Sequence, residues 1–106
     1  MVLRTWRGVV ETADADGYFA YLQKTGIREY KATPGNRGVF VVRRERNGRT
    51  EYFLLSLWDS MDAVERFAGD TPGTAVFYPE DDDFLVERDE HVDHYEVLEA
   101  PGIAVT

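Results

Sequence analysis

The dipeptide Asn47-Gly48 constrains the fold of this chain more than any other feature. Both residue types tolerate the positive φ that a two-residue hairpin turn needs, and the flanking segments are rich in Val, Phe, Leu and Tyr. We therefore predict two antiparallel strands, over residues 39–46 and 50–58. Residues 52–57 are apolar almost without interruption, which indicates a sheet that is covered on both faces.

The second of these strands leads directly into a helix. Asp59 and Ser60 both have N-cap chemistry, and residues 69–73 are rich in helix-stopping Gly and Pro. Four apolar residues between them share one helical face: Met61, Val64, Phe67 and Ala68. Pockets for small molecules tend to lie where strands end and helices begin. Trp58 stands at that joint, so we predict that it forms a pocket wall.

The remaining elements are predicted from weaker patterns. We expect a first strand over residues 2–11, a helix that begins near Asp14 and ends at Gly26 as its C-cap, and a turn at Pro34-Gly35-Asn36. Residues 27–33 and 75–78 have no clear preference. The last two expected features are an acidic surface loop at 79–83 and a final strand at 92–99.

This order, β-α-β-β-α-β, is that of an α+β, ferredoxin-like split unit, and 106 residues make a single domain spanning 1–106. Both helices then lie on one face of the sheet. The other face carries Val, Leu and Phe from residues 39–57, which is too apolar to remain in water. We therefore expect a homodimer that closes sheet against sheet into a partly closed barrel.

Charge and composition exclude several classes of partner. The formal net charge of −8 repels phosphate backbones and anionic lipid, so we expect no nucleic acid and no membrane partner. The absence of cysteine excludes disulfides and thiolate chemistry. With no signal peptide or apolar span, we expect a cytoplasmic protein. Ten of the twelve basic residues are Arg, which is typical of a GC-rich bacterial genome.

The two histidines, His91 and His94, are candidates for proton transfer. In a strand of period two, His94 and Glu96 share a face, so the carboxylate can orient the imidazole as a general base. A structural histidine remains the alternative. His91 and His94 lie on opposite faces of such a strand and cannot chelate one ion together. The acidic run 81–83 lacks the pattern of a calcium loop, so we predict no metal site.

Aromatic side chains provide candidates for binding a flat ligand. We select Trp6, Trp58, Phe77 and Tyr78 as walls and Asn36 as a possible amide donor, although a turn explains Asn36 equally well. Tyr18, Tyr21 and Phe67 are interpreted as core. The sequence contains no phosphate loop, dinucleotide fingerprint or nucleophile elbow.

The element order, together with the pattern Trp-x-Ser-x-x-Ala-x-x-x-Phe-Ala at 58–68, resembles the dimeric α+β barrel superfamily and, within it, the antibiotic-biosynthesis-monooxygenase-like group. The resemblance implies a homodimer with one pocket per subunit. Some members of the group oxidise phenolic anthrones with dioxygen and no cofactor, and others bind and degrade haem. Trp58 matches the family's tryptophan. Residue 54 is Leu where the oxygenases use Asn, and Phe77 and Tyr78 stand where the haem degraders place histidine.

The sequence and the resemblance together favour a cofactor-independent monooxygenase that oxidises a phenolic or polyketide-like aromatic substrate, with His94 as the base and Trp58 as a pocket wall. Two alternatives remain open. One is an oxygen-independent cyclase, lyase or isomerase that uses the same pocket. The other is a non-catalytic protein that binds haem or a small aromatic ligand.

Overall fold

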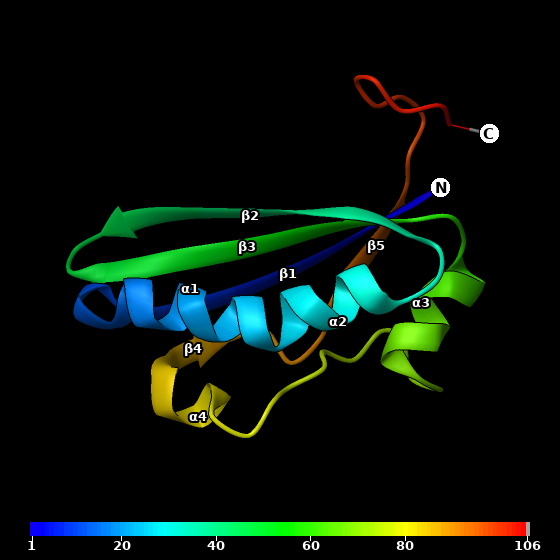
Figure 1. Ribbon diagram of the computed structural model, residues 1–106. Coiled ribbons are helices and arrows are strands. Elements are labelled where there is room, and N and C mark those ends of the chain that lie inside the picture. The colour runs from blue at the N-terminus through cyan, green and yellow to red at the C-terminus, as the bar shows by residue number, and fades with distance from the viewer. Residues whose placement is uncertain (106) are drawn as a thin grey trace.

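An antiparallel sheet forms the frame of the computed structural model, which describes residues 1–105 (Figure 1). Its strands are β1 (Val2–Glu11), β2 (Asn36–Arg46), β3 (Arg49–Trp58), β4 (Leu85–Arg88) and β5 (Asp93–Glu96). The order is β2-β3-β1, and β4 and β5 share the free edge of β1. There β5 pairs with residues 2–5 of β1, and β4 pairs with residues 8–10 across a bulge.

Helices cover one face of this sheet and leave the other bare (Figure 1). Their bounds are α1 (Ala15–Lys24), α2 (Gly26–Ala32), α3 (Met61–Ala68) and the short α4 (Asp81–Phe84). Together α1 and α2 run along the sheet, α3 lies at the end where β3 stops, and the α3–α4 loop, residues 69–80, passes under α2. No helix within residues 1–105 is long and apolar enough to span a membrane.

The predicted α+β, ferredoxin-like unit is confirmed, with its last strand divided into β4 and β5. Asn47 and Gly48 have φ of 55° and 78°, as the predicted hairpin turn requires. The N-cap of α3 is Ser60, whose Oγ accepts from the backbone N–H of Ala63 at 3.2 Å. These features depend on neighbouring residues in the sequence, so short-range reasoning identifies them.

The first predicted helix does not end at Gly26. The chain breaks at Thr25, whose φ of −119° and ψ of −98° are not helical, and then resumes as α2 with Gly26 as its first residue. The buried side chains of Ile27 and Tyr30 give α2 an apolar face, which holds it against the sheet. Packing therefore decides the structure of a segment whose sequence pattern is ambiguous.

Three other expectations are corrected by the structure. The final strand covers residues 93–96 rather than 92–99, and β4 precedes it. The acidic segment is not all exposed, because Asp81 is 5% exposed and its Oδ2 accepts from the Tyr78 N–H at 2.6 Å. On α3, Ala63 is fully buried, whereas Met61 is 36% exposed. The correction to the last strand arises from pairing with β1, which lies far away in sequence, whereas the hydrogen bond of Asp81 with Tyr78 is local.

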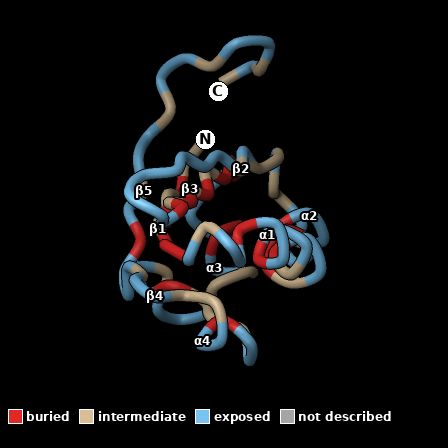
Figure 2. Tube along the Cα trace, turned by 90° about the vertical axis from the view of Figure 1, so that its left-hand side faces the viewer, coloured by how far each residue is buried: buried red, intermediate tan, exposed pale blue. Residues whose placement is uncertain are grey.

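The core lies between the sheet and the helices, where Figure 2 shows the buried segments gathered. Alternate residues of β3 face the helices and are buried, from Thr50 to Trp58. Part of the outward face is apolar, as predicted: Phe40 is 61% exposed, Val42 44% and Tyr95 53%. The part nearer the Asn47-Gly48 turn carries the ion pairs of Glu51 with Arg7 and Arg44. An open apolar sheet face of this kind is a surface for association.

Candidate active site

A small enclosed cavity lies between the sheet, the helices and the α3–α4 loop. Its wall includes five aromatic residues: Trp6, Tyr18, Tyr30, Phe67 and Tyr78. Its volume, measured as the space open to the centre of a water-sized sphere, is about 20 Å³, enough for about one water. We call this space the central cavity. It is closed tightly enough that a ring-sized ligand must displace part of its wall.

A larger groove of about 750 Å³ lies outside the core, between the helices and β2, and is open to solvent. Phe19, Arg28 and Val41 are among its lining residues. We place the candidate site in the central cavity instead, because that space combines enclosure with buried polar groups.

The most unusual residue of the central cavity is Arg4. It occupies a helix-facing position of β1, and the residue is only 2% exposed. Its NH1 donates to the carbonyl oxygen of Pro72 at 2.5 Å and to Nε2 of His94 at 3.1 Å, and its NH2 donates to the carbonyl oxygen of Thr74 at 3.2 Å. Its Nε has no hydrogen-bond partner.

The guanidinium of Arg4 is a buried cation without a carboxylate partner. None of the ion pairs within residues 1–105 includes Arg4. Burial lowers its pKa, and the neighbouring Tyr30 hydroxyl acts in the opposite direction. Burial also raises the pKa of Tyr30, although Arg4 counteracts that shift. An arginine remains charged in such a site, so the positive charge at Arg4 is offset by carbonyl dipoles and by the ring of Phe67, whose centroid lies 5.7 Å from the guanidinium carbon.

Two further tyrosines and one acid complete the polar lining. Burial raises the pKa of Tyr18 and of Tyr78, and nearby Asp81 adds to both shifts. Both phenols are therefore neutral at pH 7 and can donate a hydrogen bond. Burial also raises the pKa of Asp81, against the hydrogen bond from the Tyr78 N–H and the charge of Arg88.

His94 lies opposite Arg4 in the register of β5 on β1. Since a guanidinium only donates hydrogen bonds, Nε2 of His94 is the acceptor, and the imidazole is neutral with its proton on Nδ1. Burial lowers the pKa of His94, the charge of Arg4 lowers it further, and Asp93 opposes both. His94 contacts the cavity through Arg4 and does not form part of its wall.

The two tryptophans differ in their relation to the cavity. Trp6 is in its wall, and its Nε1 donates to the carbonyl oxygen of Asp89 at 2.9 Å. Trp58 is fully buried behind the wall, and its Nε1 donates to Ser56 Oγ at 2.9 Å. Its ring packs against Tyr30 and Phe67, which do line the cavity, with centroids 6.0 and 5.7 Å away. Trp58 thus supports the wall from outside.

The other candidate residues are dispersed. Tyr78 lines the cavity, and Phe77 packs edge-on against Trp6 with ring centroids 6.3 Å apart. Asn36 bonds to backbone only: its Nδ2 donates to the Leu57 carbonyl oxygen, and its Oδ1 accepts from the Gly38 N–H. Glu96 is exposed at the end of β5.

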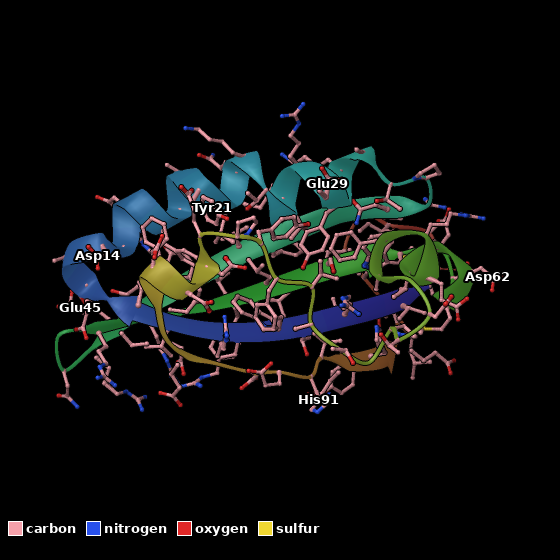
Figure 3. The ribbon with its side chains drawn as sticks, turned by 90° about the horizontal axis from the view of Figure 1, so that it is seen from below. Asp14, Tyr21, Glu29, Glu45, Asp62 and His91 are labelled. Carbon is pink, nitrogen blue, oxygen red and sulfur yellow. The ribbon has the colours of Figure 1, made fainter. Side chains whose placement is uncertain are left out.

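His91 is exposed and lies at the edge of the molecule, where its side chain points away from the core (Figure 3). Its backbone forms an isolated bridge with Thr74. No group of three or more acidic or imidazole side chains within residues 1–105 is placed to hold a metal ion.

Arg4, Tyr30 and Asp81 are functional candidates that sequence reasoning missed. The sequence does contain a pattern that could have identified Arg4. Val2, Arg4, Trp6 and Val10 occupy even-numbered positions of β1 and share one face of the strand, which places a cation among apolar side chains. Tyr30 lies in the segment without a clear preference. Asp81 belongs to an acidic run, where solvation is the usual interpretation.

Comparison with known proteins identifies related sequences and structures. The family model described as "Antibiotic biosynthesis monooxygenase" matches residues 10–72, more than half of the chain. No curated protein matches the chain in sequence.

Several solved structures have the same fold. A candidate antibiotic biosynthesis monooxygenase from Bacillus cereus has a TM-score of 0.64 at 17% identity, over 93% of this chain and 96% of that one. One from Nitrosomonas europaea has a TM-score of 0.61 at 17% identity, over 93% and 100%. The haem degrader MhuD from Mycobacterium tuberculosis, solved with two haems bound in its active site, has a TM-score of 0.58 at 17% identity, over 96% and 100%.

Proposed function

The chain belongs to the antibiotic biosynthesis monooxygenase family, and we propose that it oxidises a phenolic or polyketide-like aromatic substrate with dioxygen and without a cofactor. The observation that carries this proposal is the central cavity, enclosed, aromatic and next to a neutral imidazole. A reaction of this kind relies on the electronic properties of the substrate. The protein supplies orientation, exclusion of water and a site for the released proton.

In the proposed first step, Nε2 of His94 accepts a proton from the bound substrate. A neutral imidazole is suited to this role, and the lowered pKa of His94 keeps it neutral at pH 7. Arg4 NH1 occupies that nitrogen in the free protein, so the substrate has to take its place. The substrate oxygen then lies between Arg4 and His94 and carries a negative charge. The guanidinium of Arg4 and the newly protonated imidazole of His94 both stabilise that charge.

The ionised substrate next transfers an electron to dioxygen in the dry cavity. The substrate radical and superoxide combine at the ring carbon, and the resulting peroxide anion takes back the proton held by His94. The hydroperoxide then loses water, together with the remaining hydrogen of that carbon, to leave a carbonyl group. One oxygen atom enters the product and the other leaves as water, so the reaction needs no external reductant. Trp58 contributes by holding Tyr30 and Phe67 in the wall.

The substrate enters only if part of the wall moves. The α3–α4 loop is the part without helix or strand, and Ala75, Val76 and Tyr78 of this loop line the cavity. Its polar contacts with the rest of the molecule include those of Arg4 with the carbonyl oxygens of Pro72 and Thr74, backbone hydrogen bonds of residues 73 and 75 with residues 90–92, and one from the Glu80 N–H to the Tyr21 hydroxyl. We infer that the substrate displaces this loop.

Haem is the second candidate ligand, because the structural neighbour MhuD binds it. With the α3–α4 loop in its closed position, the central cavity does not fit a haem. Its volume is that of about one water, and the described residues of its wall include no histidine. A Soret titration of the protein with haemin tests this alternative directly, and a saturable shift with a defined stoichiometry would support it.

The experiment that tests the proposed oxygenase is oxygen uptake by purified, metal-stripped protein on a panel of anthrones and hydroquinones. We expect uptake in proportion to product, abolished in His94→Ala and kept in the matched control His91→Ala, since His91 is exposed and outside the cavity. Trp58→Phe should raise KM more than it lowers kcat, because it loosens the wall.

Three other results would overturn parts of this proposal. If no member of the panel causes oxygen uptake, the oxygenase is excluded for these substrate classes. Product formed under anaerobic conditions would indicate an oxygen-independent cyclase, lyase or isomerase. Retention of full activity in His94→Ala would remove His94 from the mechanism.

We also propose that the working unit is a homodimer. Its basis is the bare sheet face, where Phe40, Val42 and Tyr95 are exposed together. Apolar surface of this kind is stabilised by a second copy of the sheet.

A further inference from the structure

The structure points to an anionic ligand: we propose that Arg4 is the recognition group for a carboxylate or ionised phenolic oxygen on a flat aromatic molecule in the central cavity. This inference takes its binding site from the proposed function, but it concerns binding and not turnover. The two can therefore fail independently.

The first support is the uncompensated charge of Arg4. A cation that is 2% exposed is costly to bury, and no carboxylate within residues 1–105 forms an ion pair with it. An anionic ligand supplies the missing charge at the moment of binding. Buried arginines otherwise pair with acids within their own protein.

The second support is the orphan Nε of Arg4. Buried polar atoms are nearly always hydrogen-bonded, yet this N–H has no acceptor within residues 1–105. The central cavity, which Arg4 lines, has space for about one water, enough to satisfy the N–H in the free protein. An anionic oxygen is a stronger acceptor than water and takes its place.

The third support is the protonation state around Arg4. His94 accepts a hydrogen bond from NH1, so it is neutral and adds no second positive charge. Burial raises the pKa of Tyr18, Tyr30 and Tyr78, so these phenols are neutral donors rather than competing anions. The lining thus presents one fixed positive charge among rings and hydroxyls, together with the carboxyl group of Asp81, whose pKa is raised by burial. This arrangement matches a flat monoanion that binds on the Arg4 side of the cavity.

Three neighbours orient Arg4 for this task. In the free protein, NH1 and NH2 are held by the carbonyl oxygens of Pro72 and Thr74 and by His94, which leaves Nε as the free donor. NH1 becomes a second donor where a substrate separates it from His94, as in the proposed reaction. His94 is a positioning residue here. Arg4→Lys keeps the charge and loses this geometry, because an ammonium has no planar fork.

The test compares benzoate with benzamide, which has nearly the same shape and no charge, by titration calorimetry of the wild-type protein at pH 7. Benzoate has a single ring, so it displaces less of the cavity wall than a polycyclic substrate does. We expect benzoate to bind about 10- to 100-fold more tightly than benzamide, the usual ratio for a hydrogen bond to a charged group. Equal affinities, or no binding of either ligand, would overturn the inference.

A second arm identifies the source of the charge. 4-Nitrophenol changes its absorbance on ionisation, so a spectrum of the bound ligand shows whether it is phenol or phenolate. If it binds as phenolate below its pKa in solution, the site accepts ionised phenols. If benzoate binds and 4-nitrophenol does not, the site selects carboxylates, and either result supports an anion site.

Variants separate the role of Arg4 from general charge. Arg4→Met should remove the preference for benzoate, and Arg4→Lys should reduce it. The matched control is Arg37→Met, which deletes one positive charge from the surface pair with Asp59 and should leave both affinities within about twofold. If Arg4→Met does not fold, the inference is still tested by two measurements: the benzoate preference of Arg4→Lys, and the comparison of benzoate with benzamide in the wild-type protein. Oxygen uptake without any preference for benzoate would retain the proposed function and reject this inference.

Discussion

Gly8 shows how a single absent methyl group shapes the cavity wall. The residue faces the helices next to Trp6, and a Cβ added to it would lie 2.4 Å from Trp6 Cη2 and 2.9 Å from Leu85 Cδ2. The indole therefore lies across the backbone of β1 in a position that only glycine permits. This position brings Nε1 of Trp6 to the carbonyl oxygen of Asp89.

We predict that Gly8→Ala destabilises the protein by about 1–3 kcal/mol, because the added methyl displaces a rigid ring in a packed core. Urea unfolding measures the change. The matched control is Gly73→Ala, where an added Cβ meets nothing within 4 Å and the φ is not in the left-handed region. Equal stability of the two variants would show that Trp6 moves without cost.

His94 should titrate below its ordinary pKa of 6.5, because burial and the charge of Arg4 both disfavour the imidazolium. NMR titration of the ring protons measures this, with His91→Ala to assign the two signals. Asp93→Asn should lower the pKa further, since Asp93 opposes the shift. A midpoint at or above 6.5 would contradict the contact with Arg4.

The same shift links His94 to stability and rate. The folded state holds the imidazole neutral more strongly than the unfolded chain does, so its contribution to stability is complete above pH 6.5. That contribution is lost as the pH falls from 6.5 toward the lower pKa of the folded state. The acid limb of kcat/KM should likewise lie below pH 6.5.

At the scale of elements, α3 depends on its N-cap. Ser60→Ala removes the acceptor for the Ala63 N–H and should cost about 1 kcal/mol in the free energy of unfolding. Ser60→Asp retains an acceptor and should remain close to wild type. Urea denaturation of both variants checks this, and an equal loss in the two would exclude the cap as the cause.

The elements differ in how far the sequence predicts them. The Asn47-Gly48 hairpin and the cap of α3 follow from neighbouring residues, so they are predictable. The division of the last strand is not, because β4 and β5 exist through pairing with one edge of β1 and a bulge between Val9 and Val10. Packing likewise explains why the helical chain breaks at Thr25 and resumes as α2, although the sequence pattern predicts that the helix ends at Gly26.

The candidate site was predictable in part. Trp6 and Tyr78 were selected from the sequence and do line the central cavity. For Arg4 the sequence indicates only its place among the buried positions of the first strand. Its unpaired nitrogen and missing counter-ion are properties of packing, which the sequence does not reveal. The roles of His94 and Trp58 remain predictions: His94 contacts Arg4, and Trp58 supports the wall from behind.

At the scale of the whole molecule, the bare sheet face should direct assembly. We predict a mass of twice 12.1 kDa for the wild type by light scattering after size exclusion. Phe40→Glu places a charge in the middle of the apolar face and should give the monomer. Phe19→Glu, on α1 and 37% exposed, is the matched control and should stay dimeric. A monomeric wild type would refute the dimer.

The contrast between a single buried cation and a formal net charge of −8 also determines how fast a ligand arrives. Before an anionic ligand reaches Arg4, it must cross the repulsive electrostatic field of the negatively charged protein surface. Added salt screens the outer field, whose range is about 8 Å at physiological ionic strength, far more than it screens a contact in the core. Stopped-flow measurements should therefore find that benzoate associates faster as salt rises, while its dissociation rate hardly changes. The negative surface thus disfavours nonspecific binding of anions. The association rate of the anionic ligand that fits the central cavity then depends on ionic strength.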